Sequence, residues 1–419
     1  MKSTKVSASP NAGTAFNHEN ALTSTCISCG RLVHTLVDFG PQPPSNRFLK
    51  SGERDVDLHR LALGQCFTCG LVQLVDPMPA AMVRSRFPWL TYNEPEGHLD
   101  ALAERLRHLP GVEPASVIGG LSYLDDTILA RLNRLGLLRT YRLDISSDLG
   151  SDDPVAGLES VQEAVRESRS RDIAGRRGLA DLLIVRYVLE HAHDPQAFLR
   201  GLWPLVKPNG YLVLEVPDSR KFLDACDYSF VWEEHIAYFS PATLKVFLGA
   251  TGCDVVAIWI YPHALEDSLI AVVRRGIPAL QSFTEGLEAE LLRGQRYALR
   301  FPEIRERYRA RLLQFSQGGK RVALFGAGHL AAKFLNFFEL QDYVDYVIDD
   351  NPNKQTLVMP GSGLPIRDSS LLDQGRIDLC LLSLSPESEK KVLSAKRSYL
   401  ERGGDFRSIF ALSQLALPV

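Results

Sequence analysis

The chain has 419 residues, of which 45% are hydrophobic and 23% are charged, the composition of an ordinary globular protein. It is too long for one hydrophobic core, so two or three domains are expected. The formal net charge of -3 gives no reason to expect nucleic acid or an anionic membrane as a partner.

The first residues, 1–20, are rich in Ser, Thr, Asn and Ala, and we expect them to form a disordered tail. They lack the apolar core of a signal peptide, and no stretch of the sequence approaches the ~20 apolar residues that cross a bilayer. Cys226, Cys253 and Cys380 are scattered in apolar contexts and are expected to stay free thiols. Free thiols beside a thiolate metal site favour a reducing compartment, so a cytoplasmic protein is expected.

Two cysteine pairs define the next segment, residues 21–80. Each is a C-x-x-C followed by glycine, and together they comprise Cys26, Cys29, Cys66 and Cys69. Each pair brings two sulfurs of one tight turn to the same ion, and two pairs complete a tetrahedral zinc site. Such a site has no open position, so the zinc is expected to be structural. The alternative is four unrelated thiols or two redox pairs.

Residues 81–278 alternate strand and helix patterns after a helical stretch with Leu99, Leu102 and Leu106. Short apolar strands are predicted at 115–120, 140–145, 181–187, 211–216, 254–260 and 268–273. Helices are predicted at 125–135, 195–206 and 240–248. The alternation predicts an α/β domain with a doubly wound, Rossmann-like parallel sheet whose last strand is antiparallel.

Two further segments complete the chain. Residues 279–318 are charged and predicted to be a mostly helical connector, broken near Pro302. Residues 319–419 open with a strand that runs into Gly326-Ala-Gly328-His-Leu-Ala, then a helix, and the next strand ends in Asp349-Asp350. This pattern predicts a smaller Rossmann-like domain. Its glycine turn either binds a dinucleotide or serves only packing.

Several blocks of residues, in this order and spacing, resemble the three-domain, zinc-containing sugar C-methyltransferases of deoxysugar biosynthesis. The blocks are the two cysteine pairs with 69–74 (CGLVQL), 188–191 (VLEH), 194–195 (DP), 215–218 (EVPD), 232–235 (WEEH), 238–241 (YFSP) and 350–355 (DNPNKQ). The resemblance covers nearly the whole chain after residue 20.

This resemblance implies a nucleotide-linked 4-keto-6-deoxysugar as substrate and S-adenosylmethionine as methyl donor. The ketone acidifies the C–H at C-3, and a base removes the proton. His235 matches the family's base, and a histidine suits that role because its ordinary pKa lies near neutrality. Glu234 would orient or tune the site, and Tyr92 is a candidate for binding the sugar oxygen. Candidate substrate contacts are Asp218, Tyr238 and Lys354, whereas Trp232 stands where relatives often carry tyrosine.

The cofactor loop departs from the family pattern. The usual acidic residue and glycine-rich loop correspond here to Val117-Ile-Gly119-Gly120-Leu-Ser-Tyr123, with valine at the acidic position and tyrosine at the last glycine. Gly119 and Gly120 remain as the positions at which the backbone is expected to come close to the cofactor. Other candidate cofactor contacts stand at the ends of strands, where the ligands of such sheets bind, and they are Asp144, Tyr187 and His191.

Methyl transfer is therefore the expected function, and two alternatives stay open. The chain could bind a sugar nucleotide without methyl transfer, or move a proton through His235 without a methyl donor, as an epimerase does. It could also be an oxidoreductase that uses NAD in the last domain. For this reading, the deciding feature is whether Asp349 or Asp350 faces the glycine turn.

Overall fold

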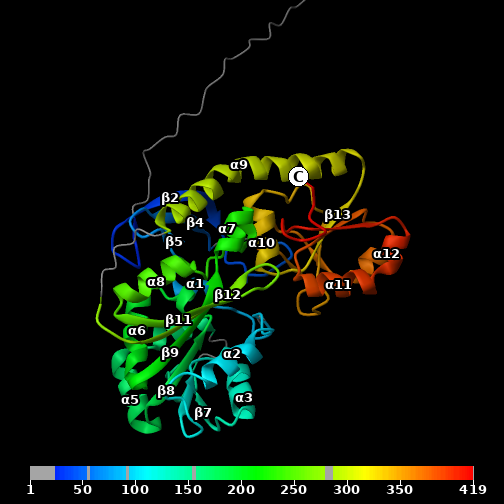
Figure 1. The fold of residues 1–419 in the computed structure, drawn as a ribbon. Helices are drawn as coiled ribbons and strands as arrows, with labels where there is room; N and C mark the ends of the chain where they lie inside the picture. The colour runs from blue at the N-terminus through cyan, green and yellow to red at the C-terminus, as the bar shows by residue number, and fades with distance from the viewer. Residues whose placement is uncertain (1–23, 54–56, 91–93, 153–156, 279–285, 419) are drawn as a thin grey trace, which may run out of the picture.

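The computed structural model describes residues 24–53, 57–90, 94–152, 157–278 and 286–418, which form three parts bridged by one long helix (Figure 1). The tail expected over residues 1–20 lies outside the described residues. Within the described ranges, no helix has the length and apolar character that crossing a bilayer requires.

The first part is built on an antiparallel sheet with the strand order β1-β2-β4-β5-β10. Its first four strands are β1 (Ser24–Thr25), β2 (Leu32–Gln42), β4 (His59–Cys66) and β5 (Val72–Leu74), and a short helix, α1 (Ala80–Val83), follows. The fifth strand, β10 (Ala237–Tyr238), belongs to the middle of the chain. It pairs with β5, with Ala237 opposite Gln73 and Tyr238 opposite Val72. The cysteine-containing sheet is thus completed by a strand more than 150 residues away in sequence.

The middle part is a six-stranded sheet with the order β11-β12-β9-β8-β6-β7. The strands are β6 (Val117–Gly120), β7 (Arg139–Arg142), β8 (Ala180–Arg186), β9 (Val206–Asp218), β11 (Cys253–Tyr261) and β12 (Asp267–Arg275). Neighbours pair in parallel from β7 to β9, whereas β12 is antiparallel to both of its neighbours. The predicted doubly wound sheet with an antiparallel last strand is confirmed.

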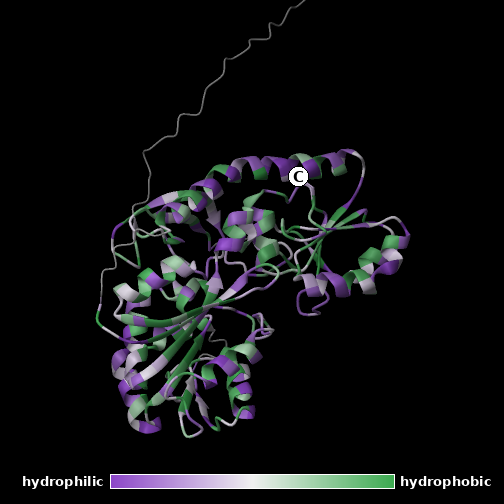
Figure 2. Ribbon diagram, in the orientation of Figure 1, coloured by the Kyte–Doolittle hydropathy of each residue, from purple (hydrophilic) through white to green (hydrophobic). Residues whose placement is uncertain are grey.

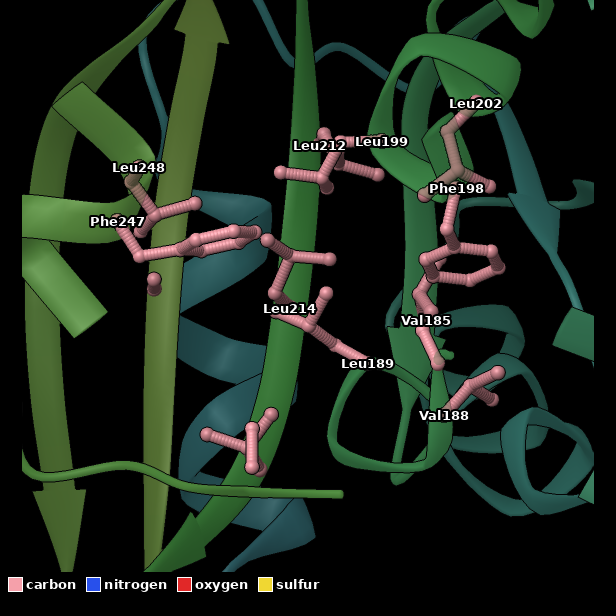
Figure 3. Packing of buried hydrophobic residues seen from close by; sticks show 14 of the residues in the cluster. Val185, Val188, Leu189, Phe198, Leu199, Leu202, Leu212, Leu214, Phe247 and Leu248 are labelled. Carbon is pink, nitrogen blue, oxygen red and sulfur yellow. The ribbon is translucent and has the colours of Figure 1, made fainter. Parts of the chain in front are cut away.

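Helices cover both faces of this sheet because side chains of its strands alternate between them. On one face, strands β8 and β9 pack against α6 (Pro195–Leu202) and α8 (Pro241–Ala250) (Figure 3). The buried side chains there include Val185, Leu212, Leu214, Phe198, Leu202 and Phe247. On the opposite face, Leu182 and Ile184 pack against α2 (Leu99–Arg107) and α3 (Asp126–Arg134). Figure 2 shows the hydrophobic strands at the centre of this sandwich.

The sequence patterns gave no element between β7 and β8, where the structure has α4 (Leu158–Ala164) and α5 (Glu167–Arg177). Helix α5 buries only Ser170 and Ile173, so it shows almost no apolar periodicity. A further short helix, α7 (Arg220–Ala225), follows β9. The 3-10 turns are η2 (Tyr123–Asp125), η3 (Leu189–His191), η4 (Trp203–Leu205), η5 (Tyr228–Phe230) and η6 (Ser369–Gln374).

Helix α9 (Leu287–Gln317) is continuous and contains Pro302, so the predicted break is wrong. Proline costs the helix a backbone hydrogen bond. The loss is offset because Tyr297, Phe301 and Tyr308 are buried on either side of it. The helix runs over the first part to the last part of the molecule (Figure 1), and hydrophilic residues are spread along its length (Figure 2).

The last part is a five-stranded parallel sheet with the order β16-β14-β13-β17-β18. Its elements are β13 (Val322–Phe325), α10 (His329–Phe337), β14 (Tyr346–Ile348), β16 (Ile366–Arg367), β17 (Leu379–Leu382), α11 (Pro386–Ala395), α12 (Arg397–Glu401) and β18 (Asp405–Ser408). A small ribbon of β3 (Leu49–Lys50) and β15 (Leu357–Val358) ties this part to the first. The predicted smaller Rossmann-like domain is confirmed.

Candidate active site and zinc centre

The four cysteines of the two C-x-x-C pairs meet at one point. Their sulfur atoms all lie within 4.8 Å of one another, with Cys26 Sγ 3.5 Å from Cys69 Sγ and Cys29 Sγ 3.4 Å from Cys66 Sγ. Each pair is wound into a tight turn. The N–H of Gly30 donates to Cys26 O and that of Gly70 to Cys66 O, both at 2.8 Å, with φ of 70° and 77° at the glycines.

This geometry fits zinc. Four thiolates at ~2.3 Å from one ion lie about 3.8 Å apart, close to the separations seen here. The four cysteines are therefore the ligands of a zinc ion, and since they fill all four positions the ion is structural. The zinc ion joins the turn before β2 to the end of β4 and the turn before β5.

The segment that carries His235 is held by this zinc module. Strand β10 begins two residues after His235 and pairs with β5, and Leu74 N–H donates to Ile236 O at 3.0 Å. Tyr238 folds its hydroxyl back to this segment, where it accepts the N–H of Trp232 at 2.9 Å and donates to Trp232 O at 3.1 Å. The hydroxyl predicted to bind substrate is thus engaged in fixing the loop.

Two acids in the same segment join all three parts of the molecule. Glu233 is fully buried, accepts the N–H of Ser45 and forms an ion pair with Lys333 Nζ at 2.5 Å. Glu234 accepts a hydrogen bond at 3.2 Å from Asn46, whose amide also donates to Val83 O. Burial, with Glu233 as a neighbour, raises the pKa of Glu234 well above its ordinary value. The predicted orienting residue is itself oriented by the zinc module.

His235 lies beside two other titratable groups, Glu190 and His191. One ligand atom from each of the three lies within 4.8 Å of the others, and the two imidazole centroids are 4.7 Å apart. Burial lowers the pKa of His191 to about 4 and, with His191 and His329 nearby, lowers that of His235 well below its ordinary value. Both rings are therefore neutral at physiological pH.

His235 opens onto a cavity of about 760 Å³ between the middle and last parts. Trp232 lies next to it and stacks on His329 at the start of α10, with ring centroids 4.2 Å apart. The middle part supplies acids to the wall, namely Glu94, Glu96 and Glu266. The last part supplies the first residues of two helices, His329 and Leu330 of α10 and Ser385 and Pro386 at α11.

The glycines of the predicted cofactor loop are packed against side chains. A Cβ on Gly119 would lie 2.9 Å from the Tyr141 ring, and one on Gly120 would lie 2.8 Å from Asp125 Cβ. Asp125 also accepts the N–H groups of Leu121 and Ser122 at 2.7 and 2.8 Å. The loop amides are thus satisfied from within the protein. Tyr123 is 46% exposed and does not line the cavity beside His235.

Two other predicted cofactor residues have local partners. Asp144 is exposed just beyond β7, and one of its carboxylate oxygens accepts from Ser147 N–H and Oγ. Tyr187 is buried and its hydroxyl contacts Ser268 Oγ in β12 at 2.7 Å. Its φ of 53° marks a sharp turn at the end of β8. His191 belongs to the His235 cluster instead.

The remaining predicted substrate residues are paired away from His235. Asp218 forms an ion pair with Arg220 at 2.6 Å. Lys354 Nζ binds Asp349 Oδ2 at 2.9 Å and Ala327 O at 2.8 Å, and Asp349 also accepts the Ala327 N–H. Asp349 therefore faces the glycine turn, but as the partner of a lysine. Tyr92 lies outside the described residues.

The sequence did not single out Glu190, Glu94, Glu266 or the Trp232–His329 stack. Glu190 was visible only as part of the Val188–His191 block, and nothing in the pattern separated it from its neighbours. His329 was visible as the first residue after the glycine turn, yet only the folded chain brings it 4.2 Å from Trp232.

The acids around this cavity suit a cationic ligand. Burial raises the pKa of Glu94 to about 7 and that of Glu266 well above its ordinary value. A positive charge beside such groups would restore their ionisation. S-adenosylmethionine carries a sulfonium cation, and the carboxyl groups of Glu94 and Glu266 in the cavity wall fit that charge.

Three family models match consecutive stretches of the chain. A zinc binding domain matches residues 26–82, a methyltransferase domain matches 88–258, and a C-methyltransferase C-terminal domain matches 287–411. The three matches follow the three parts of the structure in order.

One curated relative is the C-methyltransferase NovU of Streptomyces niveus, which is 26% identical over 264 residues. The match covers 60% of this chain and 62% of NovU, so this chain spans less than two thirds of its relative.

Solved methyltransferases are similar to less than half of this chain, and only weakly. One is the 1,6-didemethyltoxoflavin-N1-methyltransferase of Burkholderia thailandensis, with 15% identity and a TM-score of 0.29, covering 43% of this chain and 77% of that one. Another is the magnesium protoporphyrin IX methyltransferase of Synechocystis PCC 6803, with 18% identity and a TM-score of 0.26, covering 42% of this chain and 76% of that one. Likenesses at these scores bear on neither cofactor nor substrate.

Proposed function

The chain belongs to the zinc-containing, three-domain C-methyltransferases, and from this premise we propose that it methylates a carbon, C-3 in our assignment, of a nucleotide-linked 4-keto-6-deoxysugar. His235 is the proposed base. The observation that carries the proposal is the neutral His235 imidazole in the wall of a cavity of about 760 Å³ that two domains share. We place this activity in the cytoplasm, where zinc thiolates stay reduced.

The base role follows from the surroundings of His235. Its lowered pKa keeps the imidazole unprotonated at physiological pH, so a ring nitrogen has a lone pair for the substrate proton. Such a weakly basic ring needs help once it holds the proton. Glu190, within 4.8 Å, has a raised pKa, and it would ionise beside the imidazolium and stabilise its charge.

S-adenosylmethionine, when bound, would supply an electrophilic methyl group to the carbon from which the proton has left. The contribution of the chain is positional. Asp144 would bind the cofactor ribose, and Trp232 and His329 would wall the cavity and exclude water from the reacting carbon. Pairing of β10 with β5 would hold His235 at a fixed height above the sheet.

The last domain would bind the nucleotide end of the substrate. Helices α10 and α11 both begin at the cavity, and the positive end of a helix dipole favours phosphate. The opposite wall carries Glu94 and Glu266, which would repel a diphosphate. Glu387 stands on the wall from the last domain as well, so the starts of the two helices, rather than a difference in charge between the walls, would orient the substrate, with its phosphates at the last domain and its sugar at His235.

Solvent deuterium exchange tests the base. Incubated with a 4-keto-6-deoxysugar nucleotide and the methyl donor in deuterium oxide, the wild-type protein should methylate C-3, and unmethylated substrate should gain deuterium at the same carbon. His235→Gln should lose both signals, whereas His108→Gln, on an exposed ring, should lose neither. Full exchange in His235→Gln would refute the role of His235.

Calorimetry tests the cofactor separately. Wild-type protein should bind S-adenosylmethionine, Asp144→Asn should bind it more weakly, and Asp172→Asn, on the exposed face of α5, should match wild type. Absence of binding would refute methyl transfer. The deuterium experiment would then test only whether His235 removes a proton from the substrate.

A second candidate is proton transfer without a methyl donor, as in an epimerase. It is favoured by one observation, the engagement of the Leu121 and Ser122 amides by Asp125. Deuterium uptake at C-3 in the absence of S-adenosylmethionine, together with no binding of that cofactor, would support it. The NAD reading gains less support, because Lys354 neutralises the acid that would meet the ribose.

A further inference from the structure

Glu190 is a buried acid without a partner. Its side chain is 1% exposed, and neither carboxylate oxygen accepts a hydrogen bond from another described residue. No ion pair among the described residues includes it. An isolated buried carboxylate costs several kcal/mol, so a fold that keeps one either holds it protonated or supplies a cation.

His191 is arranged as metal-binding histidines usually are. One of its ring nitrogens bonds to the backbone of Glu234, which fixes the ring and leaves the other nitrogen as a ligand. The ring is buried. His235 presents a second neutral imidazole and lines the cavity, which gives an ion a path from solvent.

The three groups converge from two segments of the chain. Glu190 and His191 are neighbours in the turn η3, and His235 comes from the loop before β10, where Ile236 N–H donates to Glu190 O at 2.7 Å. One ligand atom from each lies within 4.8 Å of the other two. Ligands of one divalent ion at ~2.1 Å lie about 3–4 Å apart, so small side-chain rotations would close the site.

We propose that Glu190, His191 and His235 form a second metal site, which takes a divalent transition-metal ion of the zinc class. Two imidazoles and one carboxylate are a ligand set that such ions prefer, and three protein ligands leave a position open toward the cavity. The site is distinct from the four-cysteine centre in ligands and in having that open position.

The second ion would compete with the base. A bound ion uses the lone pair of His235 that would otherwise accept a proton, so the loaded site would block proton abstraction. This inference goes beyond the proposed function, and metal binding can be measured whether or not the protein methylates a sugar.

The test is to count cobalt in full-length protein. Wild-type protein exchanged into Co²⁺ should bind two ions per chain by elemental analysis. One should show the charge-transfer absorption of thiolate ligands, and the other only the weaker visible bands of nitrogen and oxygen ligands. Glu190→Gln, which keeps the shape but not the charge, should bind one ion and keep the thiolate absorption. His108→Gln should still bind two, which excludes a surface histidine.

A stoichiometry of one in wild type would overturn the proposal, as would a second ion retained unchanged in both Glu190→Gln and His191→Asn. Should those variants fail to fold, wild-type protein decides the question. Loaded with Cu²⁺ after zinc has filled the cysteines, it should show magnetic coupling to two imidazole nitrogens. Absence of nitrogen coupling would overturn the proposal.

Discussion

Replacement of Lys333 by methionine should destabilise the protein more than any surface charge change. Lys333 Nζ lies 2.5 Å from Glu233 Oε2, and both side chains are 0% exposed. Removing one member of a buried pair typically costs about 3–5 kcal/mol, because the remaining charge stays desolvated. Glu233 would retain the Ser45 N–H and, at 3.3 Å, its hydroxyl, so we expect the lower end, about 3 kcal/mol.

Thermal unfolding measures the effect. For a domain of this size a loss of about 3 kcal/mol lowers Tm by roughly 6–12 °C. The matched control is Lys396→Met, which breaks a partly exposed pair with Asp373 and should cost no more than about 1 kcal/mol. The double variant Lys333→Met with Glu233→Gln removes both charges and should recover much of the loss.

Two results would refute this reasoning. One is a Tm for Lys333→Met equal to that of Lys396→Met, since burial would then contribute nothing. The other is a double variant less stable than Lys333→Met, because the cost would then come from lost packing rather than an uncompensated Glu233.

Three further predictions concern the zinc, a glycine and pH. Cys69→Ser should lose zinc and speed amide exchange at Leu74, which bonds to Ile236, whereas Cys253→Ser should do neither; unchanged exchange would contradict a zinc-held His235 loop. Gly120→Ala should lower the free energy of unfolding of the ligand-free protein by about 1–3 kcal/mol, because the added Cβ meets Asp125. Gly175→Ala, on α5 where a Cβ meets no atom, should leave it unchanged. Equal Tm values for the two variants would contradict a packing role for Gly120. Burial lowers the pKa of His329 to about 4, so the unfolded state takes up the proton first as pH falls. The free energy of unfolding of the wild type should therefore fall by up to about 3 kcal/mol between about pH 6.5 and 4. Tm should change less with pH in His329→Gln than in the wild type. Parallel curves for the two proteins would contradict the lowered pKa of His329.

The sequence sufficed for features whose chemistry is local. The C-x-x-C pairs predict zinc because each turn sets two ligands by itself, and the doubled pairs can share one ion. Strands β6, β8 and β9 were recognisable because buried parallel strands are short, continuous apolar runs. Helix α5 was not predicted because its polar sequence buries few side chains. The break at Pro302 was predicted wrongly because tertiary packing outweighs one missing hydrogen bond.

The active-site geometry depends on contacts between distant segments and could not be predicted in the same way. The sequence placed Glu234 and His235 together, but Asn46 and Ser45 reach their segment across 188 residues. The sequence also assigned Gly119 and Gly120 to the cofactor, whereas the fold shows them packed against Tyr141 and Asp125. The sequence shows that a glycine is present, but it does not show whether a ligand or a side chain of the protein packs against that glycine.

The pairing of β10 with β5 restricts how this protein can be divided. A fragment cut between the first and middle parts would leave one unpaired strand edge on each side, and the loop with His235 would lose its anchor. Such halves should express poorly alone. The same pairing limits recombination during evolution, because an exchanged middle domain must bring a strand that matches the metal-bound sheet, and the two are expected to be inherited as a single block.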